Sequence, residues 1–265
     1  MLTLSVDALP GTAGGWSAIA HPSVSVALAR AGFDWLLFDL EHGTFTLPEL
    51  RACLDAAAVA AELPVLARLP RPGSELTQQV TDLGVAGLLV PQVRSLDEVR
   101  VSCALASFPP DGRRGLGVGR YNYYGTAAPD SVPVFPARPL VMIQIETVEA
   151  LRLAGEIAAV PGVDALFIGP SDLGQALRAE PDALVSGRRV DGVDDAVDLV
   201  VEAARNIGKP VGMWVPDPEV AARYRARGVA FFGVGTDIRL LASAAAGLAA
   251  AVRAVAEPAA PGPGR

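Results

Sequence analysis

The chain has 265 residues, of which 51% are hydrophobic, and it carries a formal net charge of −7. This length allows one large domain with a full core, and the acidic balance argues against nucleic acid or an anionic membrane surface as a partner. The two cysteines, Cys53 and Cys103, form no CxxC pair, which argues against a disulfide framework and a zinc site and favours a reduced, cytoplasmic setting.

The two ends of the chain carry no targeting signal that we recognise. Residues 1–15 lack the basic stretch and the continuous apolar run of a signal peptide. Leu240–Ala256 is rich in alanine but is interrupted by a serine, a glycine and an arginine, so we expect a helix packed against protein rather than a membrane span. We therefore predict one domain over residues 1–257, followed by a disordered tail at 258–265.

Short apolar runs and helical segments alternate along the whole chain. The apolar runs are not strictly alternating, as expected for strands covered on both faces. They predict strands at Gly15–Ala20, Trp35–Leu40, Pro64–Leu69, Gly87–Val93, Leu140–Glu146, Ala165–Gly169, Pro210–Val215 and Ala230–Gly235. Helices are predicted between them at Ser23–Ala31, Leu47–Glu62, Gly73–Leu83, Ser95–Ser107, Val148–Val160, Val193–Ile207, Pro218–Arg227 and Thr236–Ala256.

Eight strands that alternate with eight helices predict an α/β fold, a (β/α)8 TIM barrel. Glycines at several helix–strand joints, among them Gly32 and Gly228, support these boundaries because glycine commonly ends a helix. The alternative is an open doubly wound sheet, but the first strand is not followed by a Gly-rich dinucleotide turn. Two long connections, Phe108–Arg138 and Ser171–Gly192, are expected at the carboxyl ends of the strands, where barrel active sites form.

Two acids stand at the ends of neighbouring predicted strands, Glu146 after the fifth and Asp172 after the sixth. Adjacent parallel strands lie about 4.8 Å apart, so both carboxylates can reach one cation. Two carboxylates in an otherwise open shell suit Mg²⁺, Mn²⁺ or Co²⁺. The alternative is that each acid caps a helix or loop. The barrel position favours a metal site.

Further polar residues follow the second and third predicted strands. His42 comes three residues after Asp39, and an aspartate partner would orient an imidazole that moves protons near pH 7. Arg68 can clamp a carboxylate and stabilise a developing enolate, or it can pair with a nearby acid. A surface-loop histidine is the alternative for His42. Lys209, the only lysine, precedes the seventh strand, so a Schiff-base mechanism has no nucleophile at this face.

Several phrases in order resemble the HpcH/HpaI aldolase family of metal-dependent class II pyruvate aldolases. The resemblance spans roughly Gly14 to Ala250. The matching phrases are Gly32–Trp35, Asp39–His42, Val90–Val93, Phe108–Gly115, Gln144–Thr147, Gly162–Asp164 and Gly169–Leu173. This many phrases in one order is a more specific signal than any single short motif.

The resemblance implies a role for each matching residue. Glu146 and Asp172 match metal ligands, and His42 matches the catalytic base that acts with Asp39. Arg68 matches the arginine that holds the pyruvyl group. The implied keto-acid cradle consists of Gln144, Gly169, Pro170 and Ser171, and Trp16 and Trp214 complete the substrate-binding candidates. Asp82 matches an aspartate offered to a neighbouring subunit, and the implied assembly is a homo-oligomer, a hexamer or trimer of dimers.

The implied reaction is reversible aldol cleavage of a 4-hydroxy-2-keto acid to pyruvate, or a related keto acid, and an aldehyde. The sequence departs from the family around the aldehyde end, at Gly43–Phe45, Tyr121–Tyr124 and Trp214, so the acceptor stays open. Rival readings are an oxaloacetate decarboxylase or a specialised carbon–carbon bond-forming enzyme, and a citrate-lyase-like enzyme acting on a CoA thioester. A catalytically silent scaffold is a third, and the intact strand-end acids argue against it.

Overall fold

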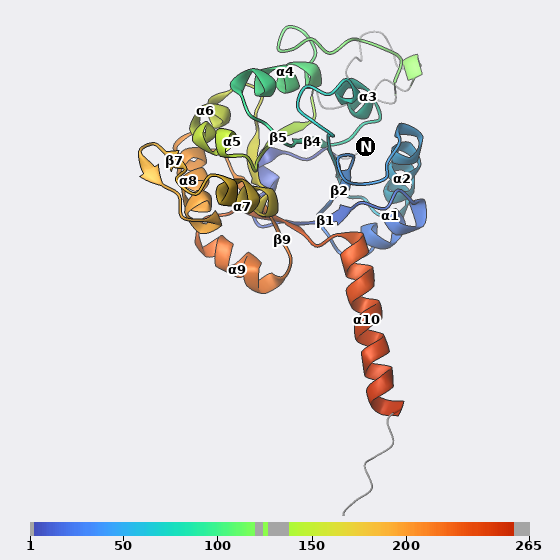
Figure 1. Ribbon diagram of the computed structural model, residues 1–265. Helices are drawn as coiled ribbons and strands as arrows, with labels where there is room; N and C mark the ends of the chain where they lie inside the picture. The colour runs from blue at the N-terminus through green and yellow to red at the C-terminus, as the bar shows by residue number, and fades with distance from the viewer. Residues whose placement is uncertain (1–2, 120–123, 127–137, 257–265) are drawn as a thin grey trace, which may run out of the picture.

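The computed structural model describes residues 3–119, 124–126 and 138–256, and in them eight parallel strands close into a barrel (Figure 1). Their order around the barrel is β1-β10-β9-β6-β5-β4-β3-β2, and β1 pairs with both β2 and β10. The strands are β1 (Ala13–Ser17), β2 (Trp35–Asp39), β3 (Val65–Arg68), β4 (Gly87–Val90), β5 (Leu140–Ile145), β6 (Ala165–Ile168), β9 (Val211–Val215) and β10 (Phe231–Val234). The predicted barrel is confirmed, because an open sheet leaves two edges unpaired.

Helices surround the barrel in the described part of the chain, as Figure 1 shows. A short 3-10 helix, η1 (Val6–Ala8), precedes the first strand. The α-helices are α1 (Pro22–Ala29), α2 (Leu47–Ala60), α3 (Leu76–Asp82), α4 (Leu96–Ala106), α5 (Val148–Arg152), α6 (Ala154–Ala159), α7 (Pro170–Ala179), α8 (Val193–Asn206), α9 (Pro218–Ala226) and α10 (Asp237–Ala256). The predicted helix-ending glycines do end helices, with positive φ at Gly32 (89°) and Gly228 (99°).

Three predicted segments differ from the structure. The first strand begins and ends two or three residues earlier than predicted. The helix predicted at Val148–Val160 is two helices, α5 and α6, which meet at Leu153. The connection predicted at Ser171–Gly192 contains α7 and a small hairpin, β7 (Leu184–Val185) with β8 (Arg188–Arg189). Pro170 occupies the first turn of α7, a usual place for proline. The sequence pattern predicts a connection here rather than a helix.

Two apolar clusters hold the barrel together. One lies between the strands and the surrounding helices, and it gathers outward side chains such as Leu36, Phe38 and Ile143. The other gathers the alternate side chains of the strands inside the barrel, including Trp35, Phe167 and Phe231. Glycine leaves room for this interior: a Cβ added at Gly14 would lie 2.1 Å from the Trp35 ring. Because both faces of these strands are buried, their sequences are continuous apolar runs.

The last helix, α10, projects away from the barrel (Figure 1). Among the described residues, the segment Asp237–Val255 is the one helix long and apolar enough to cross a membrane by length and composition, with a mean hydropathy of 1.6. Apart from Asp237 at its start, none of that segment is buried within the single chain. The expectation of a helix packed on protein is thus not met inside one chain. The predicted tail at 258–265 lies outside the described residues.

Candidate active site at the carboxyl end of the barrel

A cavity of about 370 Å³ opens at the carboxyl ends of the strands. This volume falls in the range of pockets that hold small metabolites. Its walls include ten of the residues singled out from the sequence, namely Trp16, Asp39, His42, Arg68, Gln144, Gly169, Pro170, Ser171, Asp172 and Trp214. The remaining lining residues are Ala18, Thr236, Ile238 and Arg239. Barrel topology thus brings together residues that are up to about two hundred positions apart in the sequence.

Arg68 and Asp39 form a buried ion pair between adjacent strands. They are register partners on β3 and β2, and the side chains are 8% and 4% exposed. The Arg68 guanidinium donates to both Asp39 oxygens, with Nε–Oδ1 at 2.9 Å, and it also lies 2.9 Å from Glu41 Oε2. Burial alone would raise the pKa of Asp39, but the guanidinium holds it below its usual value. Arg68 is therefore fixed in place as a buried positive charge.

Trp16 lies beneath this ion pair. Its indole ring is 5.0 Å from the Arg68 Cζ atom, and its Nε1 donates to Asp39 Oδ2 at 3.3 Å. The residue is 4% exposed and its ring also contacts Phe167 inside the barrel. Trp16 thus forms the floor on which the charged residues of the cavity rest.

His42 stands at the rim of the cavity with a side chain that is 65% exposed. Asp39 Oδ1 accepts hydrogen bonds from the backbone amides of Glu41 (3.0 Å) and His42 (3.2 Å). Among the contacts of the described residues, the acid nearest the imidazole is Glu41, with His42 Nε2 3.9 Å from Glu41 Oε1. Asp39 therefore fixes the backbone that carries His42, whereas the sequence suggested a direct bond to its ring.

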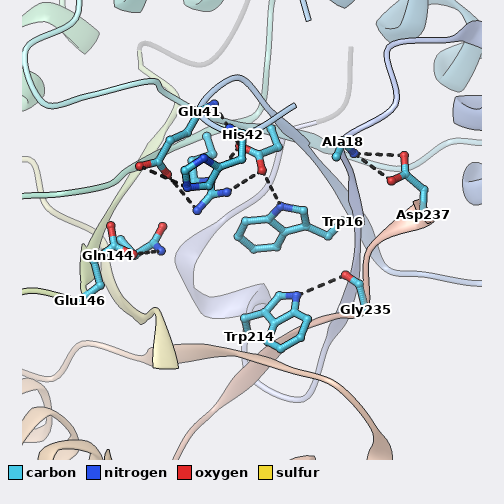
Figure 2. Close-up of polar contacts among 11 residues, drawn as sticks. Trp16, Ala18, Glu41, His42, Gln144, Glu146, Trp214, Gly235 and Asp237 are labelled. Carbon is cyan, nitrogen blue, oxygen red and sulfur yellow. Dashed lines mark hydrogen bonds and ion pairs between the residues drawn. The ribbon is translucent and has the colours of Figure 1, made fainter. Parts of the chain in front are cut away.

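Glu146 lies beside the cavity at the end of β5 and is 1% exposed. Its Oε1 accepts from the backbone amide of Gln92 at 2.7 Å, and its Oε2 accepts from Gln144 Nε2 (Figure 2). Gln144 Oε1 is buried and has no hydrogen-bond partner among the residues that the structure describes. A Cβ added at Gly169 would lie 2.6 Å from both Gln144 Nε2 and Glu146 Oε2. The backbone at Gly169 is thus pressed against this carboxylate–amide pair.

At this end of the barrel, the positive charge of Arg68 does not offset the effect of burial on Glu146 and Glu41. Burial raises the pKa of Glu146 to about 7, and the nearby carboxylates of Glu41 and Asp172 add to that rise. Burial also raises the pKa of Glu41, although Arg68 opposes the change. Two like charges in a dry site each disfavour ionisation of the other. A bound cation would reverse this penalty.

The donor atoms fit a hard divalent cation. The carboxylates of Glu146 and Asp172 and the unpartnered Gln144 Oε1 are oxygen donors of the type that Mg²⁺ and Mn²⁺ prefer. Within the described ranges, no three His, Cys, Asp or Glu side chains together form a complete metal shell. A cation held here would therefore take further ligands from solvent or substrate, which is the arrangement predicted from the sequence.

Asp82 lies outside the cavity of its own chain. It ends α3, and its Oδ1 accepts from Arg114 Nη2 at 2.5 Å. Its predicted role at a neighbouring subunit's site stays a prediction. The Tyr121–Tyr124 stretch, predicted to lie near the acceptor, falls outside the described residues except for Tyr124.

Sequence reasoning gave no individual role to four residues that the structure places at the site. Glu41 enters the sequence prediction only as part of the phrase Asp39–His42, and Gln92 holds Glu146 from a left-handed backbone conformation with φ 54°. Asp237, at the start of α10, accepts from the amide of Ala18 (Figure 2) and also from the amide of Ile19. Arg239 lines the cavity. The positive φ of Gln92, a non-glycine residue, is a backbone feature that no sequence pattern reveals.

Comparisons with known proteins agree with the geometry. The model of the HpcH/HpaI aldolase/citrate lyase family matches residues 12–244. A hydroxypyruvate/pyruvate aldolase of Delftia acidovorans is 37% identical over 232 residues, which cover 87% of this chain and 84% of that protein. A 4-hydroxy-2-oxovalerate aldolase of Novosphingobium aromaticivorans is 34% identical over 228 residues, covering 86% and 85%.

A solved structure gives the same result. A HpcH/HpaI aldolase/citrate lyase family protein from Burkholderia cenocepacia J2315 matches with a TM-score of 0.82 and 31% identity. The match covers 92% of this chain and 95% of that chain. The likeness therefore extends over the whole barrel.

Proposed function

The chain belongs to the HpcH/HpaI aldolase/citrate lyase family, and we propose that its aldol chemistry depends on a divalent cation held by Glu146 and Asp172. It is a carbon–carbon lyase. Its reaction is the reversible cleavage of a 4-hydroxy-2-keto acid to pyruvate, or a related 2-keto acid, and an aldehyde. Mg²⁺, Mn²⁺ and Co²⁺ are the candidate cations.

The observation that carries this proposal is the buried acid cluster at the cavity. Glu146 is almost fully buried, and burial together with the nearby carboxylates of Glu41 and Asp172 raises its pKa to about 7. The amide oxygen of Gln144, which bonds Glu146 through its nitrogen, has no hydrogen-bond partner among the described residues. A carboxylate in this setting is unstable as an ion unless a cation joins it. Purely structural acids would have the opposite surroundings, with enough donors to keep them charged.

A divalent cation supplies Lewis-acid chemistry when bound, because it polarises the keto group of the substrate. The Arg68 guanidinium offsets the negative charge that develops on the keto oxygen, and Asp39 and Glu41 hold it in position. The backbone amides of Ser171 and Asp172, in the first turn of α7, would bind the keto-acid carboxylate.

His42 is the group that moves the proton of the 4-hydroxyl. Its imidazole is exposed at the rim, so it can reach the acceptor end of a bound substrate. A neutral imidazole takes a proton near pH 7 and returns it in the reverse direction. Glu41, 3.9 Å away, stabilises the protonated ring.

The test is an assay of pyruvate release over a panel of 4-hydroxy-2-keto acids, with added Mg²⁺ or Mn²⁺ and with EDTA. We expect release with metal and almost none in EDTA, and we expect Glu146→Gln to abolish it. The matched control is Glu149→Gln, a change to an acid that is 45% exposed on the following helix. Full release in EDTA would contradict the metal dependence. Oxaloacetate, included in the panel, tests decarboxylation as the rival reaction.

We also propose that the chain forms a homo-oligomer in which a second copy covers α10. The exposed residues Ile238, Leu241, Leu248, Val252 and Val255 follow one another at intervals of three, four or seven, which places them along one stripe of the helix. A stripe of this kind is rarely left in water by a soluble protein. The oligomer also supplies a neighbouring site to which Asp82 could be offered.

Light scattering on the purified chain tests the oligomer. We expect a mass several times that of one chain, and a lower mass for Leu248→Asp. The control is Val59→Asp, since Val59 is 90% exposed on α2. A monomeric wild type would contradict the proposal, and recovery of the chain only in the membrane fraction would assign the helix to a bilayer instead.

A further inference from the structure

Arg239 is a second cation at the cavity, and it lies on a different part of the wall from Arg68. Arg68 ends β3, whereas Arg239 follows β10 in the first turn of α10. In the ring order of strands, β10 lies three places from β3, and β9, which carries the Trp214 ring that Arg239 contacts, lies four places from β3. In a ring of eight strands, four places is the full diameter. A substrate that reaches across the cavity from Arg68 towards Trp214 therefore comes close to Arg239 at its far end.

Trp214 holds the Arg239 side chain at the rim. The Arg239 Cζ atom lies 5.7 Å from the Trp214 ring, and both residues line the cavity. The indole is itself anchored, because its Nε1 donates to the Gly235 carbonyl at 3.3 Å (Figure 2). Asp237 ties the start of α10 to the end of β1 through Ser17 Oγ at 2.8 Å. The arginine thus projects from a fixed base.

The two arginines differ in their partners. Arg68 is occupied by Asp39 and Glu41 before any ligand arrives. Arg239 forms no ion pair with any acid among the described residues, and the residue is exposed. An arginine is charged at any physiological pH and presents a planar fork that matches carboxylate and phosphate oxygens. Its guanidinium lies over the face of the Trp214 ring, so its N–H groups are available to an anion.

We propose that Arg239, supported by Trp214, binds an anionic group at the far end of the acceptor aldehyde. The enzyme would then prefer aldehydes that carry a carboxylate, sulfonate or phosphate over neutral aldehydes of the same length. This inference rests on the proposed function, since it assumes that the keto-acid end lies against Glu146, Asp172 and Arg68. It adds the substrate class at the opposite end of the same cavity.

The test compares acceptors in matched pairs during condensation with pyruvate. Succinic semialdehyde is paired with butanal, and glyceraldehyde 3-phosphate is paired with glyceraldehyde. For each pair the ratio of kcat/KM, anionic over neutral, is measured in the wild type, Arg239→Gln, Arg239→Lys and Arg253→Gln. Arg253 lies on the same helix, far from the cavity, and serves as the matched control. Because the ratio is internal to each variant, loss of folded protein cancels.

We expect the wild type to favour the anionic member of at least one pair, and the identity of that pair separates a carboxylate acceptor from a phosphate acceptor. Arg239→Gln should lower the ratio about tenfold, mainly through KM, since a hydrogen bond to a charged group at an exposed site has roughly that effect. Arg239→Lys should restore part of it, and Arg253→Gln should leave it unchanged. An equal ratio in wild type and Arg239→Gln would overturn the inference.

The failure of this inference can be told apart from failure of the proposed function. Exchange of the pyruvate methyl hydrogens with deuterium oxide needs no acceptor, so it reports the keto-acid end alone. Exchange in the wild type together with an unchanged acceptor ratio in Arg239→Gln overturns only the role of Arg239. Absence of exchange in the presence of metal overturns the proposed function itself.

Discussion

The interior of the barrel and its carboxyl-end mouth are built from the same strands, yet they contain opposite kinds of side chain. On β2, β3 and β5 the inward positions run from Leu37 to Asp39, from Leu66 to Arg68 and from Met142 to Gln144. Each strand thus changes from an apolar to a polar inward residue within two positions. The interior supplies stability, and the last inward residue of each strand supplies chemistry.

This difference has an energetic meaning. Buried apolar side chains in the interior contribute about 1.5–3 kcal/mol each, whereas a buried acid costs free energy unless it is paired. At the mouth, Asp39 is paired with Arg68, whereas burial, with the nearby carboxylates of Glu41 and Asp172, raises the pKa of Glu146 to about 7. Substitutions in the two regions should therefore affect different measurements.

The largest effect is expected from Glu146→Gln. We expect kcat to fall about a thousandfold, since a metal ligand and its electrostatic contribution are lost together. Thermal stability in EDTA should hold or rise, because the neutral amide removes the cost of a buried carboxylate. A variant that loses both activity and fold would mean that Glu146 belongs to the structural region.

The reverse pattern is expected from Phe231→Ala. Phe231 is fully buried, and its ring centroid is 5.9 Å from that of Phe167 and 6.4 Å from that of Trp35. Urea unfolding should show a loss of about 3–5 kcal/mol, as for other buried aromatic residues cut to alanine. The kcat of the protein that remains folded should change by less than about threefold. A large change in kcat at full stability would break the division between the two regions.

Arg68→Lys tests whether the mouth needs the shape of the guanidinium or only its charge. Lysine keeps the positive charge but cannot bond Asp39 through two nitrogen atoms and also reach Glu41. We expect kcat/KM for the keto acid to fall about a hundredfold. Steady-state kinetics with pyruvate as the varied substrate give the measurement, and wild-type values in the lysine variant would show that charge alone suffices.

The pH dependence of stability gives a smaller effect with a defined sign. The pKa of Glu146 lies at about 7 in the folded chain, above the usual 4.5, so the folded state binds the extra proton. Without metal, the contribution of Glu146 to the free energy of unfolding should therefore be greatest below pH 4.5. It should fall as pH rises from 4.5 to 7. For one proton the slope is at most about 1.4 kcal/mol per pH unit.

Thermal unfolding in EDTA across that pH range measures this slope. Glu146→Gln should remove the fall, and Glu149→Gln should retain it. Saturating Mn²⁺ should oppose the fall, because a cation binds the ionised carboxylate. If the stability of the metal-free wild type, relative to that of Glu146→Gln, instead rose with pH, the Glu146 carboxylate would already be paired in the folded chain.

Much of this division could be predicted from the sequence, because the fold follows from a repeating pattern. Continuous apolar runs and helix-ending glycines such as Gly32 fixed the strand count, and the strand ends then gave Asp39, Arg68 and Asp172. Pattern alone could not give the direction of a side chain. The bond from Asp39 to the backbone at His42, and the position of Arg239 across the mouth, depend on three-dimensional packing.

Deuterium exchange at the pyruvate methyl group, followed by NMR with Mn²⁺ removed before measurement, tests the central claim most directly. The claim is that the acids of the mouth, with a cation, form the enolate of a 2-keto acid. We predict exchange by the wild type incubated with Mg²⁺ or Mn²⁺, and none above background in EDTA or with Glu146→Gln. Exchange in EDTA at the rate seen with metal would contradict the account.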